Sequence, residues 1–517
     1  VYKRQDPNYV RRGYPGDPNE FRTVGLVDVE QRSLELLELD DPTANQVVDF
    51  SWSPDGVLLL DVASDTIEDR WLYTVAPDSR KLRQIWHSNR PSRIYTSLAS
   101  AWHPDGEQVI FLSDIGDRYG LYVIDGSDPD RMPTLLTDPD YDVLSGPAVR
   151  AANDAIFYAG NGVNPYEQHV YRVGTGGGEP LRITNRPGRN AGFPSPDGRH
   201  VAIVHSDDAN PPELYIASAE GGDMRRVTTS PLPAFRERDW ARARYVSFSS
   251  EIDDYELHAR ILEPANLDPG RKYPAVFGPA YSTTVRNRWR GVYTLVQQLL
   301  VQRGYIVVQV DMRGSTGYGR DFREEFLLDF AGEDIDDVVS AANYIKAIPY
   351  VDADRLGIWG SSYGGTLTVY TLLKKPGLFC AGVAAASAVD PYFFGTDDVA
   401  IVRRPATHPV IYENAAVRFA ANLEDHLLFI HGMQDQVVPF KTIAVLVEDL
   451  IRQGKDFDIA FVPGATHAWS REPYYDRFLF GKLFEHFDRY LKPATDRSTP
   501  AGCGPLDDPS GKGEQSE

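Results

Sequence analysis

Three residues in the second half of the chain have the types and the order needed for nucleophilic catalysis. Ser362 is the central residue of GSSYG at residues 360–364, a match to the pattern Gly-x-Ser-x-Gly. A serine hydroxyl is a weak nucleophile until an imidazole accepts its proton, and the imidazole needs a carboxylate to orient it. Asp435 and His467 follow in the order Ser, Asp, His, which one known arrangement of such triads uses. The three residues predict acyl transfer at Ser362.

Each of these residues follows a short apolar segment that is typical of a buried strand. The strands are expected at residues 356–359, 427–430 and 458–462. Sites in open α/β sheets form at the carboxyl ends of strands, so three strand ends would bring the side chains together. Residues 366–373 are largely apolar and lack glycine, which predicts a helix after Ser362. Glycines on both sides of the serine permit the tight turn between strand and helix.

Other residues compete for these roles, and a glycine-serine turn without chemistry also fits residues 360–364. His486 follows Asp435 too, but its segment has aromatic and leucine residues at helical spacing, and a histidine there usually belongs to a packed or solvated helix face. A structural role is favoured for His431, which lies beside the acid loop. Asp425 precedes the expected strand and so lies at its opposite end. The sequence favours the triad over a coincidental match.

Several motifs resemble those of the prolyl oligopeptidase family of serine peptidases. They are GSSYGG at residues 360–365, HGMQD at 431–435, DMRGSTGYG at 311–319 and the closing His467. The likeness covers about half of the chain, roughly residues 245–491, and this combination of motifs is specific to the family. The dipeptidyl peptidase IV-like and acylaminoacyl-peptidase-like branches look most similar. The resemblance implies an α/β-hydrolase catalytic domain with peptidase activity.

A site for acyl transfer also needs hydrogen-bond donors for the oxyanion of the transition state. One donor should be the backbone N–H of Tyr363, which directly follows the nucleophile. A second donor should come from the loop after the strand expected at residues 274–277, and the resemblance suggests Tyr281 there. The corresponding tyrosine of dipeptidyl peptidases lies before Gly-Pro, whereas Tyr281 lies after it. A packing role for Tyr281 is therefore an open alternative.

The resemblance also implies which residues line the pocket for the residue before the scissile bond. They are Val389, Tyr392, Phe393 and Val438. Their side chains predict an apolar pocket for proline or another small apolar side chain. The paired glutamates with which dipeptidyl peptidases hold a substrate amino terminus have no clear match, because Asp207 and Asp208 fit a solvated turn better. Strict dipeptidyl peptidase activity is therefore not favoured.

The first half of the chain contains a repeat built on Pro-Asp-Gly. Its copies begin at residues 51, 101 and 193, and the second interval is close to twice the first. A degenerate copy at residues 146–158 falls in the gap. Pro fixes φ and Gly tolerates positive φ, so each copy predicts a turn followed by a strand. Sheets repeating at this spacing predict a β-propeller of about four blades, plus a partial blade near residues 24–37.

The all-β propeller is expected over residues 1–238, the α/β-hydrolase domain over residues 239–492 and a disordered tail over residues 493–517. Alternating strands and helices indicate a mainly parallel sheet with flanking helices in the second domain. Propellers of the family are larger, so this one is expected to be reduced or to lack blades upstream. The absence of an initial methionine fits the second explanation.

Composition limits the partners and leaves the compartment open. The 517 residues have a net charge of −21, which argues against nucleic acid and anionic membrane surfaces as partners. No apolar run reaches the length of a membrane span. Two cysteines are too few for a disulfide framework. No signal peptide is recognisable, but the true start of the protein is open, so cytoplasmic and periplasmic or secreted locations all remain.

Together these patterns predict a serine peptidase that acts on short peptides and requires no cofactor or metal. A peptide is the expected partner, and whether the protein forms a homodimer is left open. Two alternatives stand beside this prediction. An esterase or acyl hydrolase could use the same triad, and a TolB-like propeller joined to a degenerate hydrolase could act as a non-catalytic binding protein.

Overall fold

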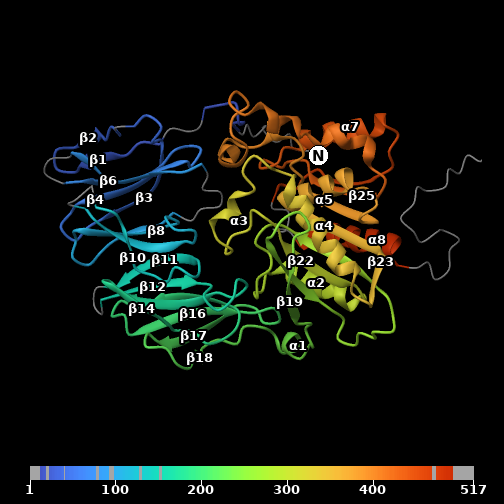
Figure 1. Ribbon diagram of the computed structural model, residues 1–517, viewed down its shortest axis with the longest axis horizontal. Helices are drawn as coiled ribbons and strands as arrows, with labels where there is room; N and C mark the ends of the chain where they lie inside the picture. The colour runs from blue at the N-terminus through green and yellow to red at the C-terminus, as the bar shows by residue number, and fades with distance from the viewer. Residues whose placement is uncertain are drawn as a thin grey trace, which may run out of the picture.

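The chain forms two bodies of different construction that lie side by side (Figure 1). Small antiparallel sheets make up the amino-terminal body, and one large sheet with helices makes up the carboxy-terminal body. The computed structural model describes residues 12–18, 22–39, 41–76, 81–91, 98–126, 131–150, 154–467 and 473–492. The tail expected at residues 493–517 lies outside this range. Within it, no helix is long and apolar enough to cross a membrane.

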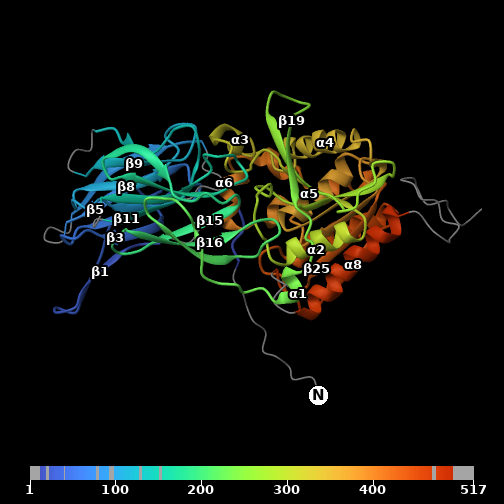
Figure 2. The same cartoon turned by 90° about the horizontal axis from the view of Figure 1, so that it is seen from below.

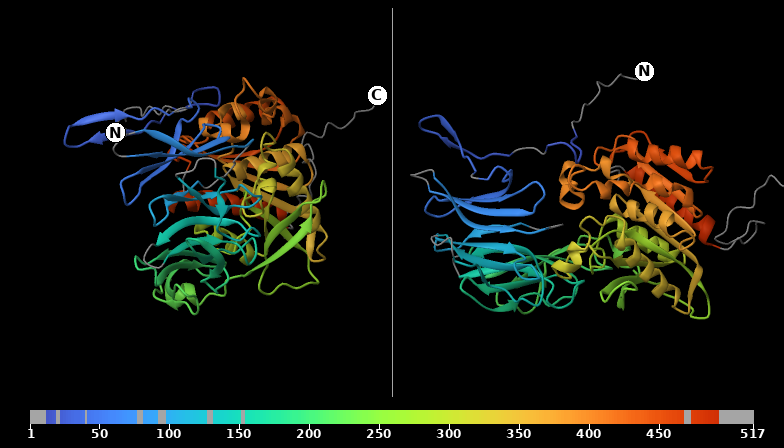
Figure 3. Two further views of the ribbon diagram at one scale, coloured as in Figure 1. Left: turned by 60° about the vertical axis from the view of Figure 1, so that its left-hand side comes forward. Right: turned by 45° about the horizontal axis from the view of Figure 1, so that its top comes forward.

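Four sheets of four antiparallel strands form most of the amino-terminal body, and the strands of each sheet pair in chain order. They are β3 (Gln46–Trp52), β4 (Leu58–Ala63), β5 (Asp69–Val75) and β6 (Leu82–Asn89); β7 (Ser100–Trp102), β8 (Gln108–Ser113), β9 (Gly120–Asp125) and β10 (Thr134–Leu135); β11 (Val143–Arg150), β12 (Ala155–Gly160), β13 (His169–Gly174) and β14 (Gly177–Arg182); and β15 (Arg189–Pro194), β16 (His200–Ser206), β17 (Glu213–Ser218) and β18 (Arg225–Arg226). A separate hairpin consists of β1 (Gly25–Asp28) and β2 (Ser33–Leu36). Figures 1 and 3 show these sheets following one another from blue to green. The propeller-like architecture is confirmed.

The Pro-Asp-Gly turns connect the first and second strands of three of these sheets. Their glycines, Gly56, Gly106 and Gly198, have φ values of 80°, 76° and 65°, a region that residues with a β-carbon rarely adopt. The strand after the first turn, β4, is buried along its whole length. Its alternate residues enter two different apolar clusters, with Leu58 and Leu60 in one and Leu59 in the other. One face therefore packs against the next sheet, and the other is covered by the segment that includes Leu37 and Ala44.

One eight-stranded sheet organises the carboxy-terminal body, in the order β19-β20-β22-β21-β23-β24-β25-β26. Its strands are β19 (Ala243–Ser249), β20 (Glu256–Leu262), β21 (Tyr273–Ala280), β22 (Ile306–Asp311), β23 (Val351–Ser361), β24 (Ala381–Ala385), β25 (His426–Gly432) and β26 (Asp458–Val462). The pairs from β22 to β26 are parallel, whereas β19 and β20 join the edge in antiparallel orientation. The mainly parallel sheet predicted from the alternation of strands and helices is confirmed.

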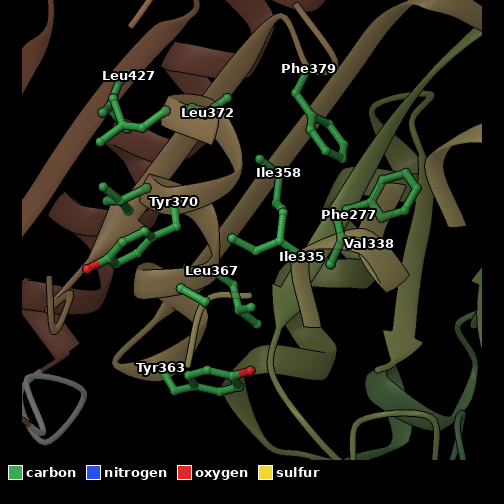
Figure 4. Packing of buried hydrophobic residues seen from close by; sticks show 14 of the residues in the cluster. Phe277, Ile335, Val338, Ile358, Tyr363, Leu367, Tyr370, Leu372, Phe379 and Leu427 are labelled. Atoms are coloured by element: carbon green, nitrogen blue, oxygen red, sulfur yellow. The ribbon is translucent and has the colours of Figure 1, made fainter. Parts of the chain in front are cut away.

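Helices cover both faces of this sheet. The helices in the described part of the chain are α1 (Pro233–Arg236), α2 (Val292–Gln302), α3 (Arg320–Glu324), α4 (Glu333–Lys346), α5 (Tyr363–Lys374), α6 (Val399–Val402), α7 (Phe440–Arg452) and α8 (Pro473–Leu491), with short 3-10 turns η2 (Pro391–Phe393), η3 (Thr396–Asp398), η4 (Pro409–Glu413) and η5 (Ala416–Asn422). Helices α4, α5 and α7 bury their apolar residues in one cluster, part of which Figure 4 shows. Helices α2 and α8, side by side in Figure 2, bury theirs in a second cluster.

The two bodies are joined through one short turn in each four-stranded sheet. The turn after the second strand supplies Asp65, Asp114, Asn161 and Asp208 in the four sheets. Asp208 forms a 2.7 Å ion pair with Arg260, and Asp114 forms one of the same length with Arg323. Asp65 pairs with Arg404, and Asn161 donates a 2.9 Å hydrogen bond to the carbonyl of Gly317. The prediction of a solvated turn was therefore wrong for Asp208, which is buried against the hydrolase sheet.

Replacing Asp208 by alanine should lower the thermal unfolding midpoint markedly. Both side chains of the Asp208–Arg260 pair are almost fully buried, so the variant leaves a buried guanidinium without its carboxylate, at a cost of about 3–5 kcal/mol. Asp197→Ala breaks an exposed pair with Arg199 in the same sheet and is the matched control, with little expected effect. Differential scanning calorimetry of the two variants makes the comparison. Equal midpoints would contradict the role given to Asp208.

Candidate active site

Ser362 occupies a strained turn between β23 and α5. Its backbone has φ 59° and ψ −124°, a conformation that costs a non-glycine residue about 1–3 kcal/mol. The flanking glycines make the turn possible. A β-carbon on Gly364 would lie 1.8 Å from the carbonyl oxygen of Ala280, and one on Gly360 would lie 2.5 Å from the backbone of Gly364. The nucleophile candidate is thus presented by a backbone that tolerates no other residue at these two positions.

The parallel pairing of the strands brings the three candidates to one edge of the sheet. Ser362 follows β23, and its N–H donates a 2.9 Å hydrogen bond to the carbonyl of Ala385 at the end of β24. Asp435 follows β25, and His467 follows β26. Because β23, β24, β25 and β26 are parallel neighbours, their carboxyl ends meet at the same edge.

Asp435 and His467 are in direct contact. Nδ1 of His467 lies 2.8 Å from Oδ2 of Asp435. The other carboxylate oxygen accepts the backbone N–H groups of Val437 and Val438 at 2.9 and 2.8 Å. The Asp435 side chain is fully buried, whereas that of His467 is 22 % exposed. The carboxylate is therefore fixed by the backbone and holds one side of an imidazole whose ring reaches solvent.

The two competing histidines, His431 and His486, form hydrogen bonds with backbone carbonyls. Nε2 of His431 lies 3.0 Å from the carbonyl of Val438 and 3.6 Å from Oδ2 of Asp435, so this buried ring supports the acid loop. Burial lowers the pKa of His431, which keeps the ring neutral at neutral pH. His486 lies on α8, with Nε2 3.2 Å from the carbonyl of His426 at the opposite end of β25.

The two tyrosines expected at the oxyanion site both lie beside the nucleophile. Burial raises the pKa of the Tyr281 phenol, and a hydrogen bond with the Ser362 side chain acts in the opposite direction. The Tyr281 and Tyr363 rings meet edge to face with centroids 5.4 Å apart. Tyr281 therefore lies beside the residue that follows Ser362, even though it comes after the Gly-Pro step.

Sequence reasoning missed the anchor of Tyr363. Its hydroxyl donates a 2.6 Å hydrogen bond to Oδ2 of Asp334, a fully buried residue near the start of α4. The other oxygen of Asp334 accepts the N–H of Ile335 at 3.0 Å. Burial raises the pKa of Asp334 to about 7. The only sequence signal was an acidic residue at the start of an amphipathic helix, which does not identify a partner on another helix.

The predicted pocket residues differ in their surroundings. Val389 and Val438 are buried, Phe393 is half-buried, and Tyr392 is 54 % exposed with its ring against Tyr412. The structure joins Phe393 to the acid loop through a residue that the sequence did not suggest. Arg12 donates hydrogen bonds to the carbonyls of Gln436 at 2.6 Å and Phe393 at 3.1 Å, and to that of Val437.

Arg12 lies 424 positions before Gln436 in the sequence, so no local pattern could have linked them. No group of three His, Cys, Asp or Glu side chains suited to a metal ion occurs in the part of the chain that the structure describes.

The sheet and its edge residues define the class of protein. A mainly parallel sheet covered by helices on both faces, with a nucleophile candidate on the turn after a central strand, is an α/β-hydrolase. Residues 292–494 match the sequence profile of the Prolyl oligopeptidase family, and residues 3–229 match that of the Dipeptidyl peptidase IV (DPP IV) N-terminal region. Over residues 292–494 the chain thus carries the sequence profile of the prolyl oligopeptidase family.

Individual relatives agree with this placement. The chain is 25 % identical over 497 residues to a probable dipeptidyl-aminopeptidase B of Aspergillus terreus, covering 89 % of this chain and 53 % of the relative. It is 28 % identical over 370 residues to human dipeptidyl peptidase 8, covering 66 % and 40 %. The chain thus spans about half the length of its curated relatives.

Solved structures share the fold. The crystal structure of Porphyromonas gingivalis dipeptidyl peptidase 4 superposes with a TM-score of 0.80 at 23 % identity, over 90 % of this chain and 68 % of that one. A putative dipeptidyl aminopeptidase IV from Bacteroides ovatus gives a TM-score of 0.83 at 19 % identity, over 93 % and 71 %.

The buried Asp334 should make stability depend on pH. Its pKa is raised from 3.8 to about 7, so between these values the folded protein holds a proton that the unfolded chain has lost. This contribution to stability therefore falls as the pH rises through that range. In Asp334→Asn the fall in unfolding midpoint between pH 5 and pH 8 should be smaller than in the wild type.

The control is Asp254→Asn, because Asp254 is an exposed carboxylate of the same domain. It should keep the wild-type pH dependence. A pH dependence in Asp334→Asn equal to that of the wild type would show that Asp334 titrates normally.

Proposed function

We propose that the chain is a serine peptidase that cleaves peptide bonds in short peptides through Ser362, His467 and Asp435. The observation that supports this most strongly is the 2.8 Å contact between His467 and Asp435 at the sheet edge where the strained Ser362 lies. The names of the relatives, which are dipeptidyl peptidases and aminopeptidases, support a peptide as substrate.

The proposed reaction follows from these positions. Nε2 of His467 accepts the proton of Ser362 while Oγ attacks the scissile carbonyl carbon. Asp435 accepts the hydrogen bond of Nδ1–H and so fixes the tautomer of the imidazole that can act as a base. The imidazolium then gives its proton to the leaving amine, which departs and leaves an acyl-enzyme. Water, deprotonated by the same imidazole, releases the acyl group.

Two donors are proposed for the oxyanion, the backbone N–H of Tyr363 and the hydroxyl of Tyr281. The Tyr281 phenol lies near enough to the Ser362 hydroxyl for that group to lower its pKa, which supports the second donor. Asp334 would position Tyr363 through its phenol. Val389, Tyr392, Phe393 and Val438 are proposed to line the pocket for a small apolar residue before the scissile bond.

The division into a propeller over residues 1–238 and a hydrolase over residues 239–492 is also proposed. The two profile matches, 3–229 and 292–494, support a boundary between them. The interdomain ion pairs keep the sheets of the first domain against the second, which favours short peptides over folded proteins as substrates.

Asp435→Asn should lower kcat by about 10⁴-fold, since the amide stabilises the wrong imidazole tautomer and cannot balance the imidazolium. Ser362→Ala should lose turnover more completely. The measurement is hydrolysis of a fluorogenic peptide and of the matching ester. Asp425→Asn, at the other end of β25, is the control and should keep wild-type rates. Hydrolysis of the ester alone would identify an esterase, and unchanged rates in Asp435→Asn would refute the triad.

Tyr281→Phe separates an oxyanion donor from a packing residue, because the phenyl ring keeps the contact with Tyr363 and loses only the hydroxyl. Loss of a donor should lower kcat by about 10²–10³-fold and leave KM nearly unchanged. Steady-state kinetics on the fluorogenic peptide measure both constants. A kcat within a few-fold of the wild type would assign Tyr281 to packing.

A further inference from the structure

The loop between β21 and α2 carries three arginines in alternate positions, Arg286, Arg288 and Arg290. This loop begins at Tyr281, whose ring packs edge to face against Tyr363, the residue after Ser362. Half-buried cations beside a nucleophile require an anionic partner, because a charge removed from water is costly unless it is paired. The three arginines differ in whether a carboxylate of the protein pairs with them.

Arg286 is neutralised. Its guanidinium lies 2.6 Å from Oδ2 of Asp311, and the hydroxyl of Tyr318 donates to the same oxygen at 2.8 Å. The other oxygen of Asp311 accepts the backbone N–H groups of Val285, at 2.9 Å, and Thr284. Both oxygens of this buried carboxylate are therefore occupied.

The carboxylate of Asp208 is also paired within the protein. Oδ1 of Asp208 binds Arg260, and its Oδ2 accepts the hydroxyl of Tyr245 at 2.8 Å. Asp476 lies close enough to influence the nearby Tyr293 but forms no ion pair with an arginine of the described chain.

Arg288 and Arg290 are the two remaining arginines of this loop. In the part of the chain that the structure describes, neither side chain forms an ion pair, and the buried Nε of Arg288 and Nη1 of Arg290 have no hydrogen-bond partner. Burial, followed by repulsion from Arg290 and Arg286, lowers the pKa of Arg288 to about 10. Burial also lowers the pKa of Arg290. Arg288 stays charged at neutral pH, so this loop holds two cations that form no ion pair with any described residue.

This loop lies on one side of the nucleophile. The guanidinium carbon of Arg290 is 5.8 Å from the ring centroid of Tyr293, and that ring packs against Trp359 of β23 with centroids 6.2 Å apart. In the sheet, β21 lies on one side of β23, and β24 and β25 lie on the other. The proposed pocket for the residue before the scissile bond follows β24 and β25. The arginines are thus on the opposite side, where the leaving part of a peptide would extend.

We propose that Arg288 and Arg290 bind a carboxylate on the leaving-group side of the substrate. A carboxylate matches the planar, multiple-donor geometry of guanidinium groups, and it would pair with two charges that no carboxylate of the described residues binds. The inference deepens the proposed function and rests on it for the orientation of the peptide. The carboxylate would come from the free carboxyl terminus of a short peptide or from an acidic side chain near the cut.

The test compares peptides of one sequence that end either in a carboxylate or in an amide, together with an amidated peptide carrying glutamate after the cut. Binding is measured by titration calorimetry on Ser362→Ala, so that no turnover is needed, and kcat/KM is measured on the active protein. Arg288→Gln and Arg290→Gln are added to each background. The control is Arg303→Gln, which removes a partly exposed pair with Asp488 and a cation–π contact with Phe484.

The carboxylate peptide should bind about tenfold or more tightly than the amide, as expected for charge-assisted hydrogen bonds. Each glutamine variant should reduce that preference while leaving the affinity for the amide unchanged, and Arg303→Gln should not alter it. A preference shown by the glutamate peptide instead would assign the carboxylate to a side chain and also support the site.

Equal affinity for acid and amide would overturn the inference, and so would glutamine variants that weaken both peptides alike. These outcomes can be distinguished from a failure of the proposed function. A protein that cleaves every peptide without regard to its terminus would be a peptidase without this site. One that binds acids selectively but cleaves none would have the site without the reaction.

Discussion

The geometry at Ser362 depends on a close approach of two backbones. The turn holds a serine at positive φ and brings Gly364 so near to Ala280 that a β-carbon there could not fit. Hydrogen bonding of Ser362 to the end of β24 fixes the turn against the sheet. Once β23 ends in this way, the parallel pairing of β24, β25 and β26 determines where the acid and histidine loops emerge. The 2.8 Å contact between Asp435 and His467 follows from that pairing.

Charge pairing over long distances in sequence arranges what surrounds this edge. Each four-stranded sheet contributes polar residues to the contact with the hydrolase body, and the pairs of Asp208 with Arg260 and Asp114 with Arg323 are among the most completely buried of these links. Arg12 ties the loop after Asp435 to η2. Many arginines of this acidic protein therefore bind internal carboxylates and carbonyls. Arg288 and Arg290, which form no ion pair in the described part of the chain, are the place that we propose for an external anion.

Features encoded by local pattern were predictable from the sequence. Turn signals with glycine at positive φ, apolar strands and the alternation of strands and helices led to the propeller-like sheets and the mainly parallel sheet, both confirmed. The candidates at residues 362, 435 and 467 came from a motif and strand ends, and their catalytic roles remain predictions. Asp334, Arg12 and the burial of Asp208 were not foreseen, because each depends on a partner from a distant segment. Single-sequence patterns carry no information about such pairs.

The central claim is that three strand ends assemble an acyl-transfer site around Ser362. A crystal structure of the protein after reaction with a fluorophosphonate tests it most directly, since the adduct resembles the tetrahedral intermediate. The account predicts phosphorus bonded to Oγ of Ser362, Nε2 of His467 beside that oxygen, and the phosphoryl oxygen about 2.7–3.1 Å from the N–H of Tyr363 and the hydroxyl of Tyr281. An adduct on another residue, or a phosphoryl oxygen turned away from both tyrosines, would contradict it.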